Sequence, residues 1–190
     1  MMLLALGGCG VVHRTFYIPV YSGYLRESTT CGWVPHGSAL VPLDDTVSIA
    51  LSMAPGGENE IGLSLQVPLS PGQSLQFEQA VLVLETASGA TQANLQEFMV
   101  AVHGRNGQPG HFEQVQPTDL LEGRRNADLR IHDEPSASND LFSSNARFPV
   151  DSEAKVTLFL PRVRVNGRSV STEGIEFKLV TRTGVEACVQ

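Results

Sequence analysis

The sequence lacks any apolar run that could cross a bilayer as a helix. Such a span needs about 20 consecutive apolar residues, and no part of the 190-residue chain approaches that length. The sequence also lacks runs of Lys or Arg, since 13 basic residues are outnumbered by 20 acidic ones for a net charge of −7. Because neutralising successive phosphates requires clustered basic side chains, we do not expect nucleic acid as a partner.

Motifs of catalysis and cofactor binding are missing as well. The chain contains neither a Gly-x-Ser-x-Gly nucleophile elbow nor the HxxxH or CxxC spacing of metal sites. The nearest approach to a ligand cluster is His132-Asp133-Glu134, with His103 and His111 upstream. Adjacent side chains on a strand point to opposite faces and do not converge on one ion. We therefore predict no metal, no cofactor and no enzymatic activity.

A short apolar segment opens the chain and ends in a cysteine. Its last residues, Leu6-Gly7-Gly8-Cys9, resemble the lipobox of bacterial lipoproteins, in which a leucine and two small residues precede a lipidated cysteine. The resemblance implies that Cys9 carries diacylglycerol and that residues 1–8 are removed. Because Gly10 rather than Asp follows the cysteine, it also implies an outer-membrane lipoprotein that faces the periplasm.

The segment before Cys9 is shorter than a complete secretion signal. Such signals open with basic residues and continue through roughly 7 to 15 apolar ones, whereas no Lys or Arg precedes Cys9. We therefore expect the natural signal to begin upstream of Met1, with residues 1–8 as its end and 9–190 as a single domain. The alternative is that this segment belongs to the fold, as a first strand that continues through Val11 and Val12.

Cysteine is scarce, with three residues in the chain. If Cys9 carries lipid, Cys31 and Cys188 remain as an even pair. An oxidising periplasm would allow them to form a disulfide between the start and the end of the folded region. Two unpaired thiols are the alternative.

Hydrophobic residues alternate with polar ones over much of the chain. The alternation runs through 47–53, 61–67, 156–160 and 175–179, and Asn166-Gly167 is a strong hairpin turn signal. Pro161 interrupts one run and predicts a bulge or an edge position. Residues 93–102 fit a helix or a strand. With about eight or nine strands and no long helix, the pattern predicts an antiparallel β-sandwich, immunoglobulin-like in general architecture.

Residues 104–150 interrupt this alternation and predict long loops, with one short strand near Leu129 and Ile131. Such loops serve as a recognition surface or are a solvated excursion. Guanidinium groups bind carboxylates and phosphates, although acidic neighbours favour solvated ion pairs here. The candidate residues for a partner surface are Arg124, Arg125, Arg130 and His132.

These features together favour a lipid-anchored, non-catalytic envelope protein that binds a protein or cell-wall partner in the periplasm. Phe16, Tyr17, Tyr21 and Tyr24 crowd the region after the anchor, where they contact a partner or form a first strand and its turn. A general similarity to uncharacterised bacterial lipoproteins that end in a Val-Asn-Gly hairpin and a final cysteine implies no activity. The alternatives are a structural subunit of an envelope complex and, less favoured, a periplasmic hydrolase that uses His132.

Overall fold

The computed structural model describes residues 10–28, 36–57, 59–102, 111–124, 130–131, 134–135 and 140–186. These residues form antiparallel strands, turns and one short 3-10 helix, without an α-helix among them. Within this described part of the chain, no helix has the length and apolarity needed to traverse a membrane. The predicted all-β fold of antiparallel sheets in a sandwich-like arrangement is confirmed.

The strands are short in the turn-rich regions and longest near the two ends of the chain. In chain order the elements are β1 (Gly10–Pro19), η1 (Ser22–Tyr24), β2 (Leu25–Ser28), β3 (His36–Pro42), β4 (Ser48–Pro55), β5 (Ile61–Leu69), β6 (Ser74–Phe77), β7 (Val81–Thr86), β8 (Gly89–Asn94), β9 (Phe98–Val102), β10 (His111–Val115), β11 (Leu121–Glu122), β12 (Arg130–Ile131), β13 (Glu134–Pro135), β14 (Asp140–Phe148), β15 (Lys155–Phe159), β16 (Val163–Val165), β17 (Arg168–Val170) and β18 (Ile175–Glu186).

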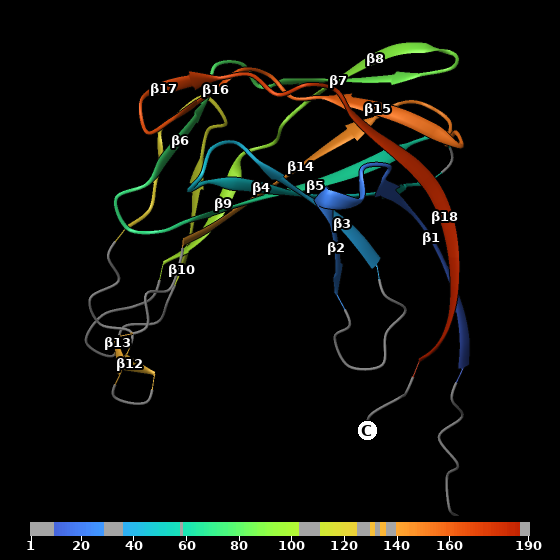
Figure 1. Ribbon diagram of the computed structural model, residues 1–190, viewed down its shortest axis with the longest axis horizontal. Coiled ribbons are helices and arrows are strands. Elements are labelled where there is room, and N and C mark those ends of the chain that lie inside the picture. Colours follow the sequence, from blue (N-terminus) through green and yellow to red (C-terminus); the bar gives the residue numbers. More distant parts are fainter. Residues whose placement is uncertain are drawn as a thin grey trace, which may run out of the picture.

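One large sheet organises the molecule. Its strand order is β10-β9-β14-β5-β4-β1-β18-β15-β7-β8, and β3 and β2 pair in succession beside β4. In Figure 1 the strands β7, β8 and β15 lie above β4, β5 and β14, while β1 and β18 descend along the right-hand side. A second sheet, ordered β11-β6-β16-β17, lies at the opposite end, and β12 pairs with β13 in a separate hairpin.

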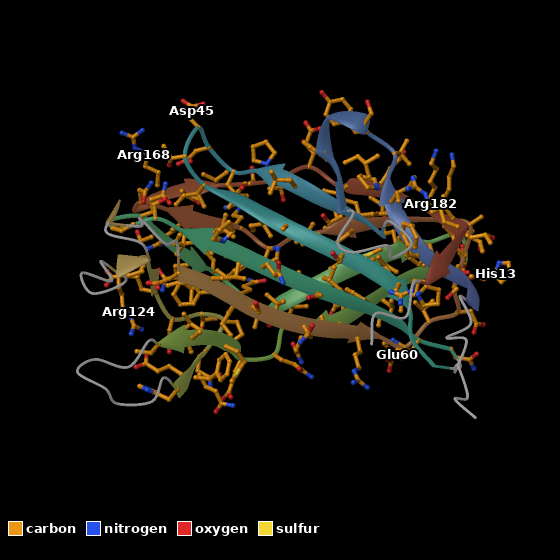
Figure 2. The ribbon with its side chains drawn as sticks, turned by 90° about the horizontal axis from the view of Figure 1, so that it is seen from below. His13, Asp45, Glu60, Arg124, Arg168 and Arg182 are labelled. Carbon is orange, nitrogen blue, oxygen red and sulfur yellow. The ribbon has the colours of Figure 1, made fainter. Side chains whose placement is uncertain are left out.

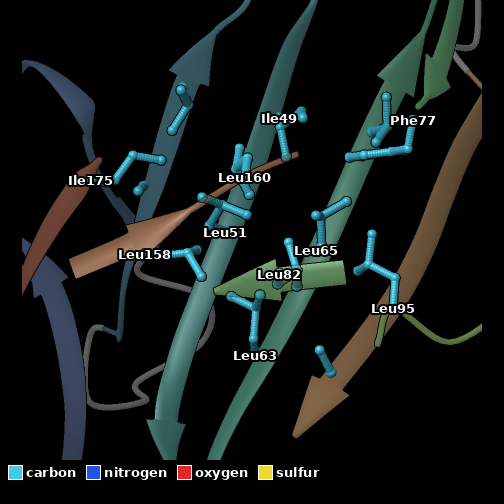
Figure 3. Packing of buried hydrophobic residues seen from close by; sticks show 14 of the residues in the cluster. Ile49, Leu51, Leu63, Leu65, Phe77, Leu82, Leu95, Leu158, Leu160 and Ile175 are labelled. Atoms are coloured by element: carbon cyan, nitrogen blue, oxygen red, sulfur yellow. The ribbon is translucent and has the colours of Figure 1, made fainter. Parts of the chain in front are cut away.

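The core lies between the two levels of the large sheet. Strand β5 buries alternate residues from Ile61 to Leu69, and β4 does the same from Ile49 to Met53. Figure 3 shows the aliphatic side chains of β4 and β5 packed against Leu82 of β7 and Leu158 of β15. Burying each such side chain stabilises the fold by about 1.5–3 kcal/mol. Because the alternation buries one side of β4 and β5, their other side faces outward.

Local turn chemistry agrees with the pairing of the strands. Asn166 and Gly167 both have positive φ, 50° and 80°, and join β16 to β17 as the Asn-Gly signal predicts. Between β3 and β4, the Asp44 carboxylate accepts hydrogen bonds from the backbone N–H groups of Thr46 at 2.7 Å and Val47 at 2.8 Å. These bonds hold the pKa of Asp44 below its usual value.

Strand β1 is fastened to the loop before β15 through a buried tyrosine. The Tyr17 hydroxyl donates to the carbonyl oxygen of Glu153 at 3.0 Å and accepts from the N–H of the same residue at 3.1 Å. Burial raises the pKa of the Tyr17 phenol. The Glu153 carboxylate in turn accepts from the backbone N–H of Ala87 at 2.7 Å, in the turn between β7 and β8. These bonds tie β1 to the upper strands of the large sheet.

The structure differs from the predicted long loops most clearly at β14. Residues Asp140–Phe148 form a nine-residue strand between β9 and β5. Its inward row includes Ser144, which is 1% exposed and donates to the carbonyl oxygen of Gln96 at 2.6 Å. A polar residue at a buried position interrupts the alternation of polar and apolar residues in the sequence. Its burial is favourable only because a hydrogen-bond partner far away in the sequence satisfies it.

The strand assignment also tests the predictions for residues 93–102 and for Pro161. Residues Phe98–Val102 are the strand β9, not a helix. The predicted bulge or edge at Pro161 is wrong, because Pro161 lies between β15 of the large sheet and β16 of the small one. The described residues form 18 strands, more than alternation predicts, because several are short or carry polar residues in buried positions.

Candidate functional site

The outward side of the large sheet carries small and polar side chains over its central strands. We call this side the outer face. The register aligns Asn145 of β14 with Ser64 of β5, and Ser64 with Ser52 of β4. The next outward row aligns Arg147 with Gly62 and Gly62 with Ala54. Small residues on neighbouring strands leave a low floor on this face.

A groove of about 680 Å³ runs over this floor, across β1, β4, β5 and β14. Gly62 keeps its centre open, since a Cβ added there would meet only the carbonyl oxygen of Ala54, at 3.8 Å. Figure 2 looks onto the molecule from below, the side of this face, and places Glu60 and Arg182 toward the right-hand end of the sheet. The volume lies within the 300–1,000 Å³ range of many ligand pockets.

The walls of the groove carry positive charge. Arg14 and Phe16 of β1 line one side, and Arg147 of β14 lines the other. Three strand intervals of about 4.8 Å separate β1 from β14, which puts the two walls roughly 14 Å apart. The guanidinium of Arg182 lies over the Phe16 ring, 5.8 Å from its centroid. An anionic ligand is therefore favoured in this groove.

One carboxylate lies beside the Arg147 wall. Glu60 Oε1 is 3.8 Å from Nη1 of Arg147, whose side chain is 71% exposed. A long, solvated ion pair contributes at most about 1 kcal/mol. Arg147 can therefore exchange this contact for a ligand carboxylate at little cost.

Among the described residues, the lining of the groove provides hydrogen-bonding groups but no catalytic base. Its hydroxyl groups belong to Thr15, Ser52 and Ser64, and its lining among the described residues contains no His, Asp or Glu. A serine nucleophile requires an adjacent base. Across the described part of the chain, no three His, Cys, Asp or Glu side chains gather as metal ligands. The arrangement suits binding through hydrogen bonds and charge.

Of the residues predicted as a partner surface, Arg124 is the one whose side chain the structure describes. It follows β11, and its Nη2 donates to Oε2 of Glu113 at 2.8 Å. This hydrogen bond lowers the pKa of Glu113. The backbone N–H of Arg124 donates to the buried Asp140 carboxylate at 2.7 Å. Arg124 therefore has an ionic partner at the end of the sheet opposite Arg182 (Figure 2).

Of the other predicted site residues, one lies in the described part of the chain. Arg130 is described by its backbone place in β12, opposite Pro135. The remaining predicted residues lie outside the described part of the chain, namely Cys9, Cys31, Arg125, His132 and Cys188. The predicted lipid attachment and disulfide stay predictions.

Sequence reasoning missed the groove because its described residues come from five separate stretches of the chain. Asn145 and Arg147 fell within the region expected to be loops. One signal was present: the outward positions of β4 and β5 from Ala50 to Ser64 are all small, where exposed strand faces usually carry larger polar side chains.

Comparison with known proteins adds no relative. No protein-family model, curated protein or solved structure gives a significant match to this chain.

Proposed function

We propose that this chain is a non-catalytic binding protein of the bacterial cell envelope that holds an acidic peptide segment in the groove of its outer face. The observation that carries the proposal is the groove itself, with small side chains on its floor and Arg14 and Arg147 on opposite walls. The peptide belongs to a protein or to the cell wall, since both present carboxylates on an extended backbone.

The shape of the groove suits an extended chain. The row Asn145, Ser64 and Ser52 offers amide and hydroxyl groups across three neighbouring strands. The adjacent row is low at Gly62 and Ala54, so a peptide backbone can approach the sheet closely. Phe16 supplies an apolar surface next to Arg14. A few polar groups in a partly apolar groove can orient a ligand.

The charges on the walls define the spacing of the ligand's acidic groups. An extended peptide rises about 3.3 Å per residue, so four residues span roughly 13 Å. This length matches the approximate separation of the Arg14 and Arg147 walls. A segment that crosses the groove with carboxylates at positions i and i+4 would reach both guanidinium groups. Arginine can bind each carboxylate with two parallel hydrogen bonds.

The predicted anchor would hold this groove near a membrane. Strand β1 begins at Gly10, directly after Cys9. Arg14 follows Cys9 by five residues, which is roughly 17 Å of extended chain. Several acyl chains at Cys9 would make the attachment stable. On this proposal the partner is captured close to the membrane surface.

A binding assay with a defined probe tests the groove. The probe is a fluorescein-labelled peptide with two glutamates four residues apart, and its control has lysines at the same positions. We expect fluorescence anisotropy to show binding of the glutamate peptide, weakened about tenfold or more by Arg147→Glu. Arg162→Glu makes the same charge change between β15 and β16, outside the groove lining, and should leave binding unchanged. Equal binding by both variants, or by both peptides, would contradict the proposal.

A separate measurement tests the anchor. The intact mass of the protein extracted from membranes, expressed with its natural upstream sequence, should show loss of residues 1–8 and added acyl chains. Cys9→Ser should abolish both changes. An unmodified mass would overturn the envelope assignment and leave the groove proposal standing.

A structural assembly subunit is the second candidate, favoured by an apolar area elsewhere on the outer face. Phe112 of β10 and Leu141 of β14 are 70% and 47% exposed, and Met99 of β9 lies on the strand between theirs. Exposed apolar patches often mark protein contacts. In this role, Phe112→Ser would release the protein from its complex on a native gel of detergent-extracted membranes. An unchanged complex would argue against it.

A further inference from the structure

A second cleft lies between η1, the end of β3 and the connection from β17 to β18. Its volume is about 430 Å³. Tyr21 and Tyr24 form one wall, Pro42 lies at the end of β3, and Thr172 and Glu173 come from the connection before β18. These residues share none with the described groove lining, so the cleft is a separate region of the surface.

The two tyrosines form an aromatic corner. Their ring centroids are 4.9 Å apart and the ring planes meet at 82°. Tyr24 packs against the core, whereas Tyr21 is 65% exposed. Gly23 permits this arrangement, because a Cβ there would lie 2.6 Å from Cε1 of Tyr21. The Tyr24 ring is therefore anchored in the core. The Tyr21 ring lies over the turn, in space that a side chain at position 23 would occupy.

The polar groups of the cleft favour a cation. Glu173 is the one charged residue in the described lining, which contains no Arg or Lys. Thr172 Oγ1 is shielded from solvent and has no hydrogen-bond partner among the described residues. Aromatic faces attract cations within about 6 Å of the ring centroid, and a nearby carboxylate adds to that attraction. The charge of this cleft is opposite to that of the groove.

We propose that this cleft binds an organic ammonium group, seated in the corner of Tyr21 and Tyr24 beside the Glu173 carboxylate. Two sources carry this chemistry, a quaternary ammonium such as a choline headgroup and the side chain of a lysine in a peptide. Both present a positive charge and alkyl groups that can contact the rings and Pro42. The inference does not depend on the groove or on the anchor at Cys9.

An NMR titration of the whole chain tests the proposal, with the Tyr21 and Tyr24 ring resonances as reporters. The probes are choline chloride and N-acetyl-lysine methylamide at matched ionic strength, with N-acetylglucosamine as the neutral comparison. We expect one or both cations to shift the ring signals and the sugar to leave them unchanged. Stronger binding of choline indicates a headgroup, and stronger binding of the lysine derivative indicates a peptide.

Four variants separate this mechanism from alternatives. Gly23→Ala should push the Tyr21 ring from its place and weaken cation binding about fivefold, without loss of the folded state. Gly57→Ala is the matched control, since a Cβ there meets nothing within 4 Å. Tyr21→Phe should bind within about twofold of the native protein, because the ring face is retained. Glu173→Gln should weaken binding about threefold.

Three results would overturn the proposal. The first is that neither cation moves the ring signals. The second is that the sugar binds as well as the cations do, which would indicate a saccharide site. The third is that Tyr21→Phe loses as much binding as Gly23→Ala, because the phenol hydroxyl would then carry the interaction.

Discussion

The groove on the outer face and the cleft beside Tyr21 and Tyr24 belong to the same fold. They differ in charge and in the elements that form them. The groove crosses four paired strands and has arginines on its walls. The cleft is assembled from a 3-10 turn and an inter-strand connection, and its charged residue is Glu173. Strands position side chains through register, whereas turns position them through local backbone shape.

On our proposals, the same fold supports two kinds of recognition. Strand order sets the spacing between Arg14 and Arg147 in units of strand separation, which suits a ligand with charges at fixed intervals. The turn at Ser22–Tyr24 brings two rings close together, which suits a single compact group. A change in the shared core should therefore affect both regions, and a change in either lining should affect one.

Removing a core aromatic should have the largest effect and damage both regions. Phe77 of β6 stacks on Phe98 of β9 with centroids 5.7 Å apart, and both rings are fully buried. Phe77→Ala should lower the free energy of unfolding by about 3–5 kcal/mol through lost burial and a cavity. Urea denaturation followed by circular dichroism measures this loss. A loss below about 1 kcal/mol would mean that the two sheets do not depend on this contact.

Filling the groove should weaken one of the two proposed binding activities and spare the other. Gly62→Ile places a branched side chain on the groove floor, and we expect glutamate-peptide binding to weaken about tenfold with choline binding unchanged. Gly62→Ala is the control, because its Cβ would make an ordinary contact at 3.8 Å. Thermal denaturation confirms that both variants fold. Tight peptide binding by the isoleucine variant would place the ligand elsewhere.

The buried phenol of Tyr17 should link stability to alkaline pH. Because burial raises its pKa above the ordinary value of 10.0, the unfolded chain ionises first. The stabilisation is complete below about pH 10 and is lost as the pH rises through the folded-state pKa. Tyr17→Phe should cost about 1–2 kcal/mol at neutral pH, through the lost bonds to Glu153, and flatten this dependence. Urea midpoints from pH 7 to pH 11 measure the loss of stability and its dependence on pH. An unchanged dependence on pH in the variant would mean that another group causes it.

Salt should weaken binding in the groove more than binding in the cleft, and this is the smallest of the expected effects. On our proposals, the groove attracts its ligand through arginine charges that salt screens, whereas part of the attraction in the cleft comes from contact with the rings. Raising the ionic strength from about 0.05 M to about 0.5 M should weaken peptide binding about fivefold and ammonium binding less than about twofold. Anisotropy and NMR titrations at both salt concentrations measure this. Equal salt dependence would mean that charge alone dominates the cleft.

Alternation of polar and apolar residues predicted the fold class because side-chain direction in a strand has a period of two. It identified β4 and β5, whose buried rows are uniformly apolar. It also identified the β16–β17 hairpin, whose turn contains Asn166 and Gly167. It failed at β14, where Ser144 occupies a buried position and depends on the carbonyl of Gln96. A bond between residues 48 positions apart cannot be inferred from local pattern.

The candidate site was less accessible to sequence analysis than the fold. The predicted surface around Arg124 rested on clustered arginines, but in the structure Arg124 is paired with Glu113 across a turn. Arg147 has no basic neighbour in the sequence, and only its place across the groove from β1 makes it a candidate binding residue. The sequence shows that Tyr21 and Tyr24 are close along the chain, whereas the angle between their rings depends on the 3-10 turn.

Local sequence pattern is sufficient to predict the all-β character and the most regular strands and turns, and it carries the resemblance of the opening segment to a lipobox. These depend on interactions between residues near one another along the chain. Only the tertiary structure decided that β1 and β14 lie three strand intervals apart, with Gly62 low between Arg14 and Arg147. Strand order results from the burial of a common core by distant segments, and many orders are compatible with one pattern of alternation.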